Sequence, residues 1–328
     1  MNKFAVVIPY FGKFRPSIVL FLESCNRNSN IDFYIFTDCE TPKNIQLSSN
    51  TKWIKFKLED INLLIQDKLG INANLSRAYK LCDIKPFYGL IFADYLKAYE
   101  YWGFGDTDVV YGNLTEFLNK INYMIWDKIN WMGHLCFIRN ESWCNRAVLS
   151  DVEGTIDAKE VLVSDKNLGF DERDFNKKCI FAGMKIYTQK WAADIDIYYW
   201  RMRCADLKTF HILLKTRELN YAPKNYAKQI FILLDGTIYR MYVKYDNVYF
   251  EEFAYIHFRK EVPIYLDTMH ANSLIFSRDG FFALPYKRED LMDKKLALEI
   301  INKYNNQENW IQELYSFLHY VKKSYKNK

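Results

Sequence analysis

The 328-residue sequence predicts an α/β protein in which helices flank a mixed, mostly parallel sheet. Two observations lead to this prediction. In the first half of the chain, short apolar runs rich in Val and Ile alternate with segments that have helical apolar spacing. Hydrophobic residues make up 50% of the chain and charged residues 26%, which is ordinary for a globular domain with a sizeable core.

The expected elements alternate regularly near the N-terminus and less regularly after it. Strands are expected over residues 4–9, 32–37 and 53–56, and helices over residues 17–25, 60–69 and 88–101. Further strands are expected within residues 130–139 and 248–258, and the tail from residue 288 to residue 328 reads as helical. Ligands of parallel sheets bind beyond the carboxyl ends of the strands, where Tyr10 and Asp38 stand.

Composition and charge indicate the cellular compartment of the protein and the kinds of partner it is expected to bind. Seven cysteines stand singly without a CxxC pair, which argues against a zinc knuckle and suits a reducing compartment. The apolar start is too short for a signal peptide, and no apolar run approaches the roughly 18 residues of a membrane span. We therefore expect a cytoplasmic protein. The net charge of +5 gives no indication of a nucleic-acid partner.

The end of the chain is basic and aromatic, with Lys322 and Lys323 near Phe317 and Tyr320. Such a segment fits a solvated helix whose apolar stripe covers the core. It also fits a helix in peripheral contact with the inner face of the cell membrane.

Asp106 and Asp108 form a DxD pattern after Gly103 and Gly105. Two carboxylates one residue apart, near a strand end, can present oxygen ligands to a hard divalent cation. The glycines are expected to permit a turn and a close approach of a ligand to the backbone. A second DxD at residues 194–196 lies in a Tyr- and Trp-rich segment without glycines, and we interpret it as structural.

Residues 79–114 (YKLCDIKPFYGLIFADYLKAYEYWGFGDTDVVYGNL) resemble the core of a bacterial family of DxD-containing glycosyltransferase-like proteins from surface-polysaccharide loci, such as those for capsule and O-antigen. Shorter matches follow in order: VIPYFGK (7–13), FTD (36–38), GHLCFIRN (133–140), FDE (170–172) and YIHFRK (255–260). The resemblance implies a GT-A-like (Rossmann-like) catalytic domain over residues 1–287. Its variable acceptor-side segment spans about residues 150–247, and a helical tail follows.

The layout is also similar to that of GT-A enzymes that retain anomeric configuration, in which a DxD and a late histidine bind Mn²⁺. This similarity implies that Asp106, Asp108 and His257 bind Mn²⁺, or Mg²⁺ in its place. Lys260 or Arg259 would then contact the diphosphate of a UDP-sugar. A structural histidine at a strand end is the alternative for His257.

The resemblance implies donor and acceptor contacts as well. Asp83 and Lys85 would touch the donor sugar, although Asp83 also suits a helix cap. Gly133 and His134 would line the acceptor side. The remaining donor contacts implied are Lys80 for the phosphates, and Tyr10, Phe11 and Asp38 for the nucleobase and ribose, with Phe11 equally suited to the core.

Asp171 and Glu172 are the candidate catalytic carboxylates. One would be the general base of an inverting enzyme, or the nucleophile or oxocarbenium-stabilising group of a retaining one. An exposed acidic loop is the competing interpretation of this pair.

The expected function is transfer of a hexose from a UDP-sugar to a glycan or lipid-linked glycan acceptor. Two alternatives stay open: a GT-A-like module that binds a nucleotide-sugar or glycan without turnover, and a sugar nucleotidyltransferase. The second would normally carry a Gly-rich basic loop near the N-terminus, where only Gly12 is present.

Overall fold

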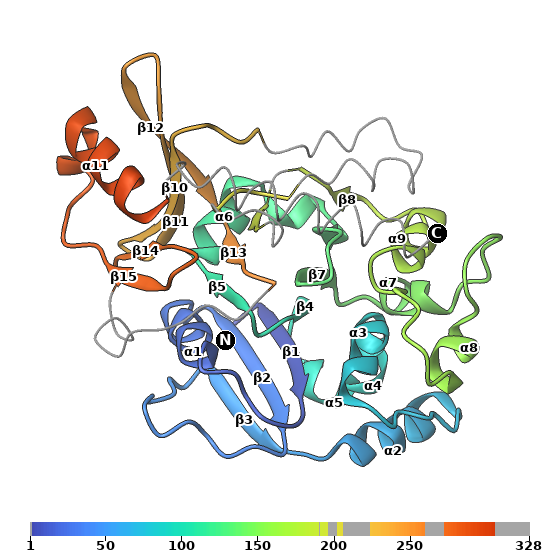
Figure 1. The fold of residues 1–328 in the computed structure, drawn as a ribbon. Helices are drawn as coiled ribbons and strands as arrows, with labels where there is room; N and C mark the ends of the chain where they lie inside the picture. Colours follow the sequence, from blue (N-terminus) through green and yellow to red (C-terminus); the bar gives the residue numbers. More distant parts are fainter. Residues whose placement is uncertain (1, 190, 196–201, 206–223, 260–271, 306–328) are drawn as a thin grey trace, which may run out of the picture.

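The computed structural model describes residues 2–189, 191–195, 202–205, 224–259 and 272–305. A seven-stranded sheet flanked by helices occupies the N-terminal part, and a five-stranded sheet stands beside it with one helix (Figure 1). A three-stranded sheet takes its strands from distant stretches of the chain.

The seven-stranded sheet has the order β3-β2-β1-β4-β7-β6-β8, and its first four strands run parallel. Strand β7 is antiparallel to both of its neighbours. The bounds of the strands, in sheet order, are Thr51–Lys55 (β3), Ile31–Thr37 (β2), Phe4–Tyr10 (β1), Tyr101–Gly105 (β4), Leu135–Arg139 (β7), Lys128–Ile129 (β6) and Ile186–Tyr187 (β8). The predicted fold class, an α/β protein with a mixed, mostly parallel sheet, is confirmed.

Helices cover both faces of this sheet. The side chains of each strand alternate between the two faces, and because the strands are apolar, both faces need to be covered. In β1, Ala5 and Val7 belong to one buried cluster, and Phe4, Val6 and Ile8 belong to the other. The helices of the first cluster are Leu58–Leu69 (α2), Leu81–Ile84 (α3), Tyr88–Ile91 (α4), Ala93–Leu96 (α5), Ser142–Arg146 (α7), Ala158–Val163 (α8) and Asp174–Phe181 (α9). Ile18–Arg27 (α1) and Leu114–Lys120 (α6) pack in the second cluster.

The five-stranded sheet is antiparallel, and of its strands only β12 falls in a range expected to be a strand. Its strands, in sheet order, are Asn247–Phe253 (β12), Thr237–Lys244 (β11), Gln229–Leu234 (β10), Leu274–Phe276 (β14) and Phe281–Ala283 (β15). Helix α11 (Lys294–Tyr304) packs on one face through Ile300 and Ile301. The described part of the expected C-terminal tail therefore contains this helix as a cover for the second sheet, and residues 306–328 lie outside the described residues.

Three expectations about local structure were wrong in detail. Residues 88–101 do not form one helix, because α4 and α5 are single turns and β4 begins at Tyr101. Residues 248–258 form two strands, β12 and Tyr255–His257 (β13), which belong to different sheets. Gly103 and Gly105 lie inside β4 and not in a turn, and a Cβ at Gly103 would collide with the backbone oxygen of Cys136 on β7.

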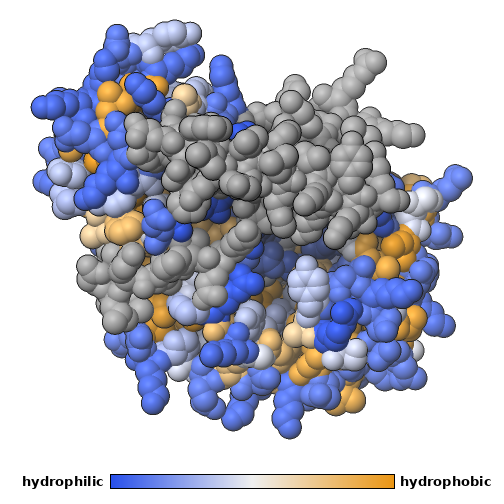
Figure 2. Space-filling view, in the orientation of Figure 1, coloured by the Kyte–Doolittle hydropathy of each residue, from blue (hydrophilic) through white to orange (hydrophobic). Residues whose placement is uncertain are grey.

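Among the coloured residues in Figure 2, hydrophilic ones predominate, and hydrophobic ones lie between them in smaller areas. None of the helices in the described ranges combines the length and the hydrophobicity that a membrane span requires.

Candidate active site

The three-stranded sheet brings together residues that are far apart in the sequence. Strand β13 pairs antiparallel with Val109–Tyr111 (β5) and parallel with Ala192–Asp194 (β9). His257 stands opposite Val109 on one side and Asp194 on the other. Because Asp108 immediately precedes β5, the pairing places the side chains of Asp108, His257 and Asp194 next to one another.

A cleft of about 870 Å³ opens over this sheet and the carboxyl ends of β1 and β4. Such a volume is typical of a small-molecule binding site. Its lining includes Tyr10, Phe11, Arg15, Tyr79, Lys85, Asp106, Asp108, His134, Glu172, Asp194, His257 and Arg259. The cleft therefore lies where parallel sheets bind ligands.

Asp106, Asp108 and His257 offer one ligand atom each, all within 4.8 Å of one another. His257 Nε2 lies 3.3 Å from Asp108 Oδ1, and its Nδ1 lies 2.9 Å from Asp194 Oδ1. Burial alone would lower the pKa of His257, but hydrogen bonds to Asp108 and Asp194 outweigh it and raise that pKa to about 10. Two carboxylates and one imidazole nitrogen at these distances fit a divalent cation of the Mn²⁺ type.

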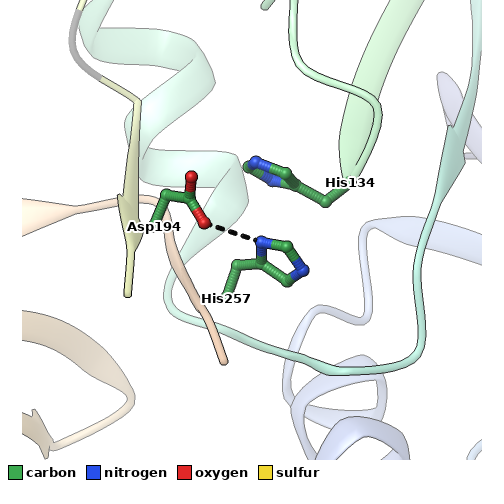
Figure 3. A group of neighbouring side chains, drawn as sticks. All are labelled: His134, Asp194 and His257. Carbon is green, nitrogen blue, oxygen red and sulfur yellow. Dashed lines mark hydrogen bonds and ion pairs between the residues drawn. The ribbon is translucent and has the colours of Figure 1, made fainter. Parts of the chain in front are cut away.

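A second group, His134, Asp194 and His257, also has its ligand atoms within 4.8 Å (Figure 3). Its geometry does not suit a metal ion. The rings of His134 and His257 stack with centroids 4.2 Å apart and planes 26° apart. An imidazole binds a metal in the plane of its ring, so two stacked rings cannot both aim a nitrogen at one ion. His134 is buried, and its ring packs against the face of the His257 ring.

Asp171 is buried, and Glu172 beside it is partly buried and lines the cleft. Burial is the main cause that raises the pKa of Asp171 to about 7, with the nearby charge of Lys85 opposing it. Burial also raises the pKa of Glu172, although the Gly133 N–H donates a hydrogen bond of 2.7 Å to its Oε1. A Cβ at Gly133 would collide with the Asp171 carboxylate, so a larger residue there would have to displace that side chain. The pair is not the exposed acidic loop that was the competing interpretation.

Lys85 connects the DxD with this carboxylate pair. Its Nζ donates a hydrogen bond of 2.5 Å to Asp106 Oδ1 and one of 3.0 Å to the Gly133 oxygen, and it lies 3.9 Å from Asp171 Oδ2. Burial disfavours the ammonium, but the carboxylates of Asp106 and Asp171 outweigh it and raise the pKa of Lys85. Lys85 therefore stays charged at the base of the cleft.

Lys80 and Asp83 are not among the residues that line the cleft. Both are buried and form an ion pair of 2.9 Å. Asp83 accepts hydrogen bonds from the backbone of Leu168 and Phe170, and Lys80 donates one to the oxygen of Lys166. The pair therefore holds the segment that leads into the candidate catalytic carboxylates.

Of the residues expected around the nucleobase and ribose, Tyr10 and Phe11 lie at the cleft and Asp38 does not. Tyr10 and Phe11 line the cleft, and the ring of Tyr10 stacks on Phe14 with centroids 4.3 Å apart. Asp38 is exposed and does not line the cleft, but it accepts a hydrogen bond of 3.0 Å from the Gly12 N–H and so shapes the loop after β1. Lys260 lies outside the described residues.

Comparison with known proteins places the chain in a family. The model of a family described as a family of unknown function, DUF6625, matches residues 6–285. The chain belongs to DUF6625. No curated protein matches it. Among solved structures, it is similar to a crystal structure of the galactosyltransferase LgtC in complex with donor and acceptor sugar analogs. The two chains are 10% identical over 94% of this chain and 99% of that chain, with a TM-score of 0.40. That score supports no conclusion about activity.

In this DUF6625 chain, the structure places two residues in the site that were not predicted there, Asp194 and Arg15, and it gives Arg259 a protein partner. Asp194, from the DxD interpreted as structural, lies in the wall of the cleft and pairs with His257. Arg15 Nη1 lies 4.0 Å from Asp108 Oδ2, whereas His257 Nε2 lies 3.3 Å from Asp108 Oδ1. Arg259, expected at a diphosphate, pairs with Asp194. The one signal for Asp194 was that a second DxD was present at all.

Proposed function

We propose that the protein is a metal-dependent hexosyltransferase that uses a UDP-sugar and acts in the cytoplasm in the synthesis of a bacterial surface polysaccharide. Its acceptor would be a glycan or a lipid-linked glycan. The observation that supports this most strongly is the convergence of Asp106, Asp108 and His257 within 4.8 Å in one cleft, which Glu172 also lines beside the buried Asp171.

The reaction breaks the bond between the anomeric carbon and a diphosphate oxygen, and it forms a bond from that carbon to an acceptor hydroxyl oxygen. The acceptor proton must be taken up, and UDP leaves with added negative charge. Asp106, Asp108 and His257 would hold a divalent cation, which neutralises that charge as a Lewis acid when bound. Arg15, which also lines the cleft, adds positive charge next to Asp108.

The other residues divide the remaining tasks. Tyr10 and Phe11 would contact the uracil and ribose at the end of β1. Asp171 or Glu172 would accept the acceptor proton in an inverting reaction, or face the anomeric carbon in a retaining one. We favour the retaining outcome, because the order of the DxD and His257 is similar to that in retaining enzymes.

A panel of UDP-hexoses, assayed for UDP release with Mn²⁺, tests the proposal. We expect one or a few of them to give release that EDTA abolishes and that added Mn²⁺ restores. Binding of UDP-sugars without release from any of them, even with candidate glycan acceptors, would instead indicate a binding module without turnover.

A further inference from the structure

Asp194 is a buried, hydrogen-bonded carboxylate to which the proposed reaction assigns no role. It is 2% exposed, and in the three-stranded sheet it is the direct neighbour of His257. An ionised carboxylate is costly to bury unless hydrogen bonds and counter-charges satisfy it. Asp194 therefore needs a physical reason to stand at this position.

Its hydrogen bonds fix the imidazole of His257. Asp194 Oδ1 accepts from His257 Nδ1 at 2.9 Å, so Nδ1 keeps its proton, and a ring that gives up the proton it shares with Asp108 has its lone pair on Nε2. Nε2 is the nitrogen that faces Asp108, at 3.3 Å. A histidine that binds a metal commonly donates its other N–H to a carboxylate, which sets both the tautomer and the orientation of the ring.

Arg259 balances the charge of this carboxylate. Its Nε donates to Asp194 Oδ1 at 2.7 Å and its Nη2 donates to Oδ2, so the guanidinium grips both oxygens. The backbone of Arg259 has a φ of +55°, a left-handed conformation that is uncommon outside glycine. His134 stacks on the ring of His257 (Figure 3), so the imidazole is held from its edge and from its face.

We propose that Asp194, with Arg259 as its counter-ion, is a positioning residue that presents His257 Nε2 to the metal ion. This inference rests on the proposed metal-dependent function. The second DxD pattern then also contributes to the metal site, and it does so only through its first aspartate, Asp194. The inference also makes Arg259 part of the support of the metal site and not the diphosphate contact.

Mn²⁺ affinity, measured by the loss of the electron paramagnetic resonance signal of free Mn²⁺ with UDP present, tests this role. Asp194→Asn is expected to weaken Mn²⁺ binding about 10–100-fold. Asp127→Asn is the matched control, because Asp127 pairs with Arg139 at 3.0 Å through the same atoms, remote from the cleft, and it should bind Mn²⁺ as the wild type does.

A second measurement needs no variant and so does not depend on whether Asp194→Asn folds. Nitrogen NMR of ¹⁵N-histidine-labelled wild-type protein with Zn²⁺, a diamagnetic substitute, should show His257 bound through Nε2 and protonated at Nδ1. Metal bound at Nδ1, or equal Mn²⁺ affinity for a folded Asp194→Asn, would overturn the inference while leaving the proposed function intact. A wild-type protein that binds no Mn²⁺ with UDP would overturn both.

Discussion

Asp108→Asn is expected to lower the rate of UDP release from the preferred UDP-sugar about 10³-fold while the protein remains folded. The substitution replaces a charged ligand with a neutral amide, next to His257 Nε2. Stabilisation of the leaving group by a metal ion is worth several kcal/mol, and about 1.4 kcal/mol corresponds to a tenfold change in rate. The measurement is the initial rate at saturating Mn²⁺, with circular dichroism as the check on folding.

Asp67→Asn makes the same chemical change on α2, where the side chain of Asp67 is 66% exposed. This control should retain the wild-type rate. An Asp108→Asn variant that kept the wild-type rate in the presence of EDTA would show that the DxD does not hold a required cation.

Asp171→Asn or Glu172→Gln, whichever removes the catalytic carboxylate, should lower the transfer rate about 10²–10⁴-fold, the usual contribution of a positioned acid or base. Glu172→Gln keeps the oxygen that accepts from the Gly133 N–H, so a loss of rate would report the lost charge and not a lost hydrogen bond. Glu160→Gln, an exposed carboxylate on α8, is the matched control for this change. Wild-type rates for both Asp171→Asn and Glu172→Gln would remove the pair from the reaction.

The raised pKa of Asp171 predicts that the transfer rate depends on pH. If the ionised form of Asp171 is required, the wild-type transfer rate should fall about tenfold per pH unit below about pH 7, as measured by the initial rate of UDP release.

The same raised pKa of Asp171 affects the free energy of unfolding. Its folded value, about 7, lies above the ordinary 3.8, so the folded state binds the extra proton between these values and stability falls as pH rises through that window. Asp171→Asn should remove that fall, as measured by urea unfolding at pH 5 and pH 8.

The parallel half of the main sheet was predictable because its signals are local. The apolar runs at residues 4–9 and 32–37 match β1 and β2 to within one residue at each end. A buried parallel strand is apolar along its whole length, so composition alone reveals it. Residues 248–258 show the limit of this argument, since periodicity does not say that the chain passes from one sheet to another near Ala254.

The first hairpin of the five-stranded sheet has a recognisable signal in the sequence. Asp235–Gly236 joins β10 to β11 as a two-residue turn in which both residues have positive φ, +48° and +79°. An Asp-Gly pair between two apolar runs is among the strongest hairpin signals. The strands on either side of it were not predicted, because helical and strand-like patterns mix between about residues 151 and 246.

The site was predictable in part. The DxD and His257 were singled out by pattern and resemblance, and the structure brings them together. Asp194 could not be found in this way, because its relation to His257 arises from strand pairing across 63 residues of sequence. The interior placement of Lys80 and Asp83 depends in the same way on a distant segment, residues 166–170.

The most direct test of the central claim is the affinity for UDP, measured by isothermal titration calorimetry with Mn²⁺ and with EDTA. The account predicts that UDP binds at least about tenfold more tightly with Mn²⁺, and that Asp108→Asn loses this difference. Equal affinity for UDP under both conditions, or no binding of UDP under either, would contradict it.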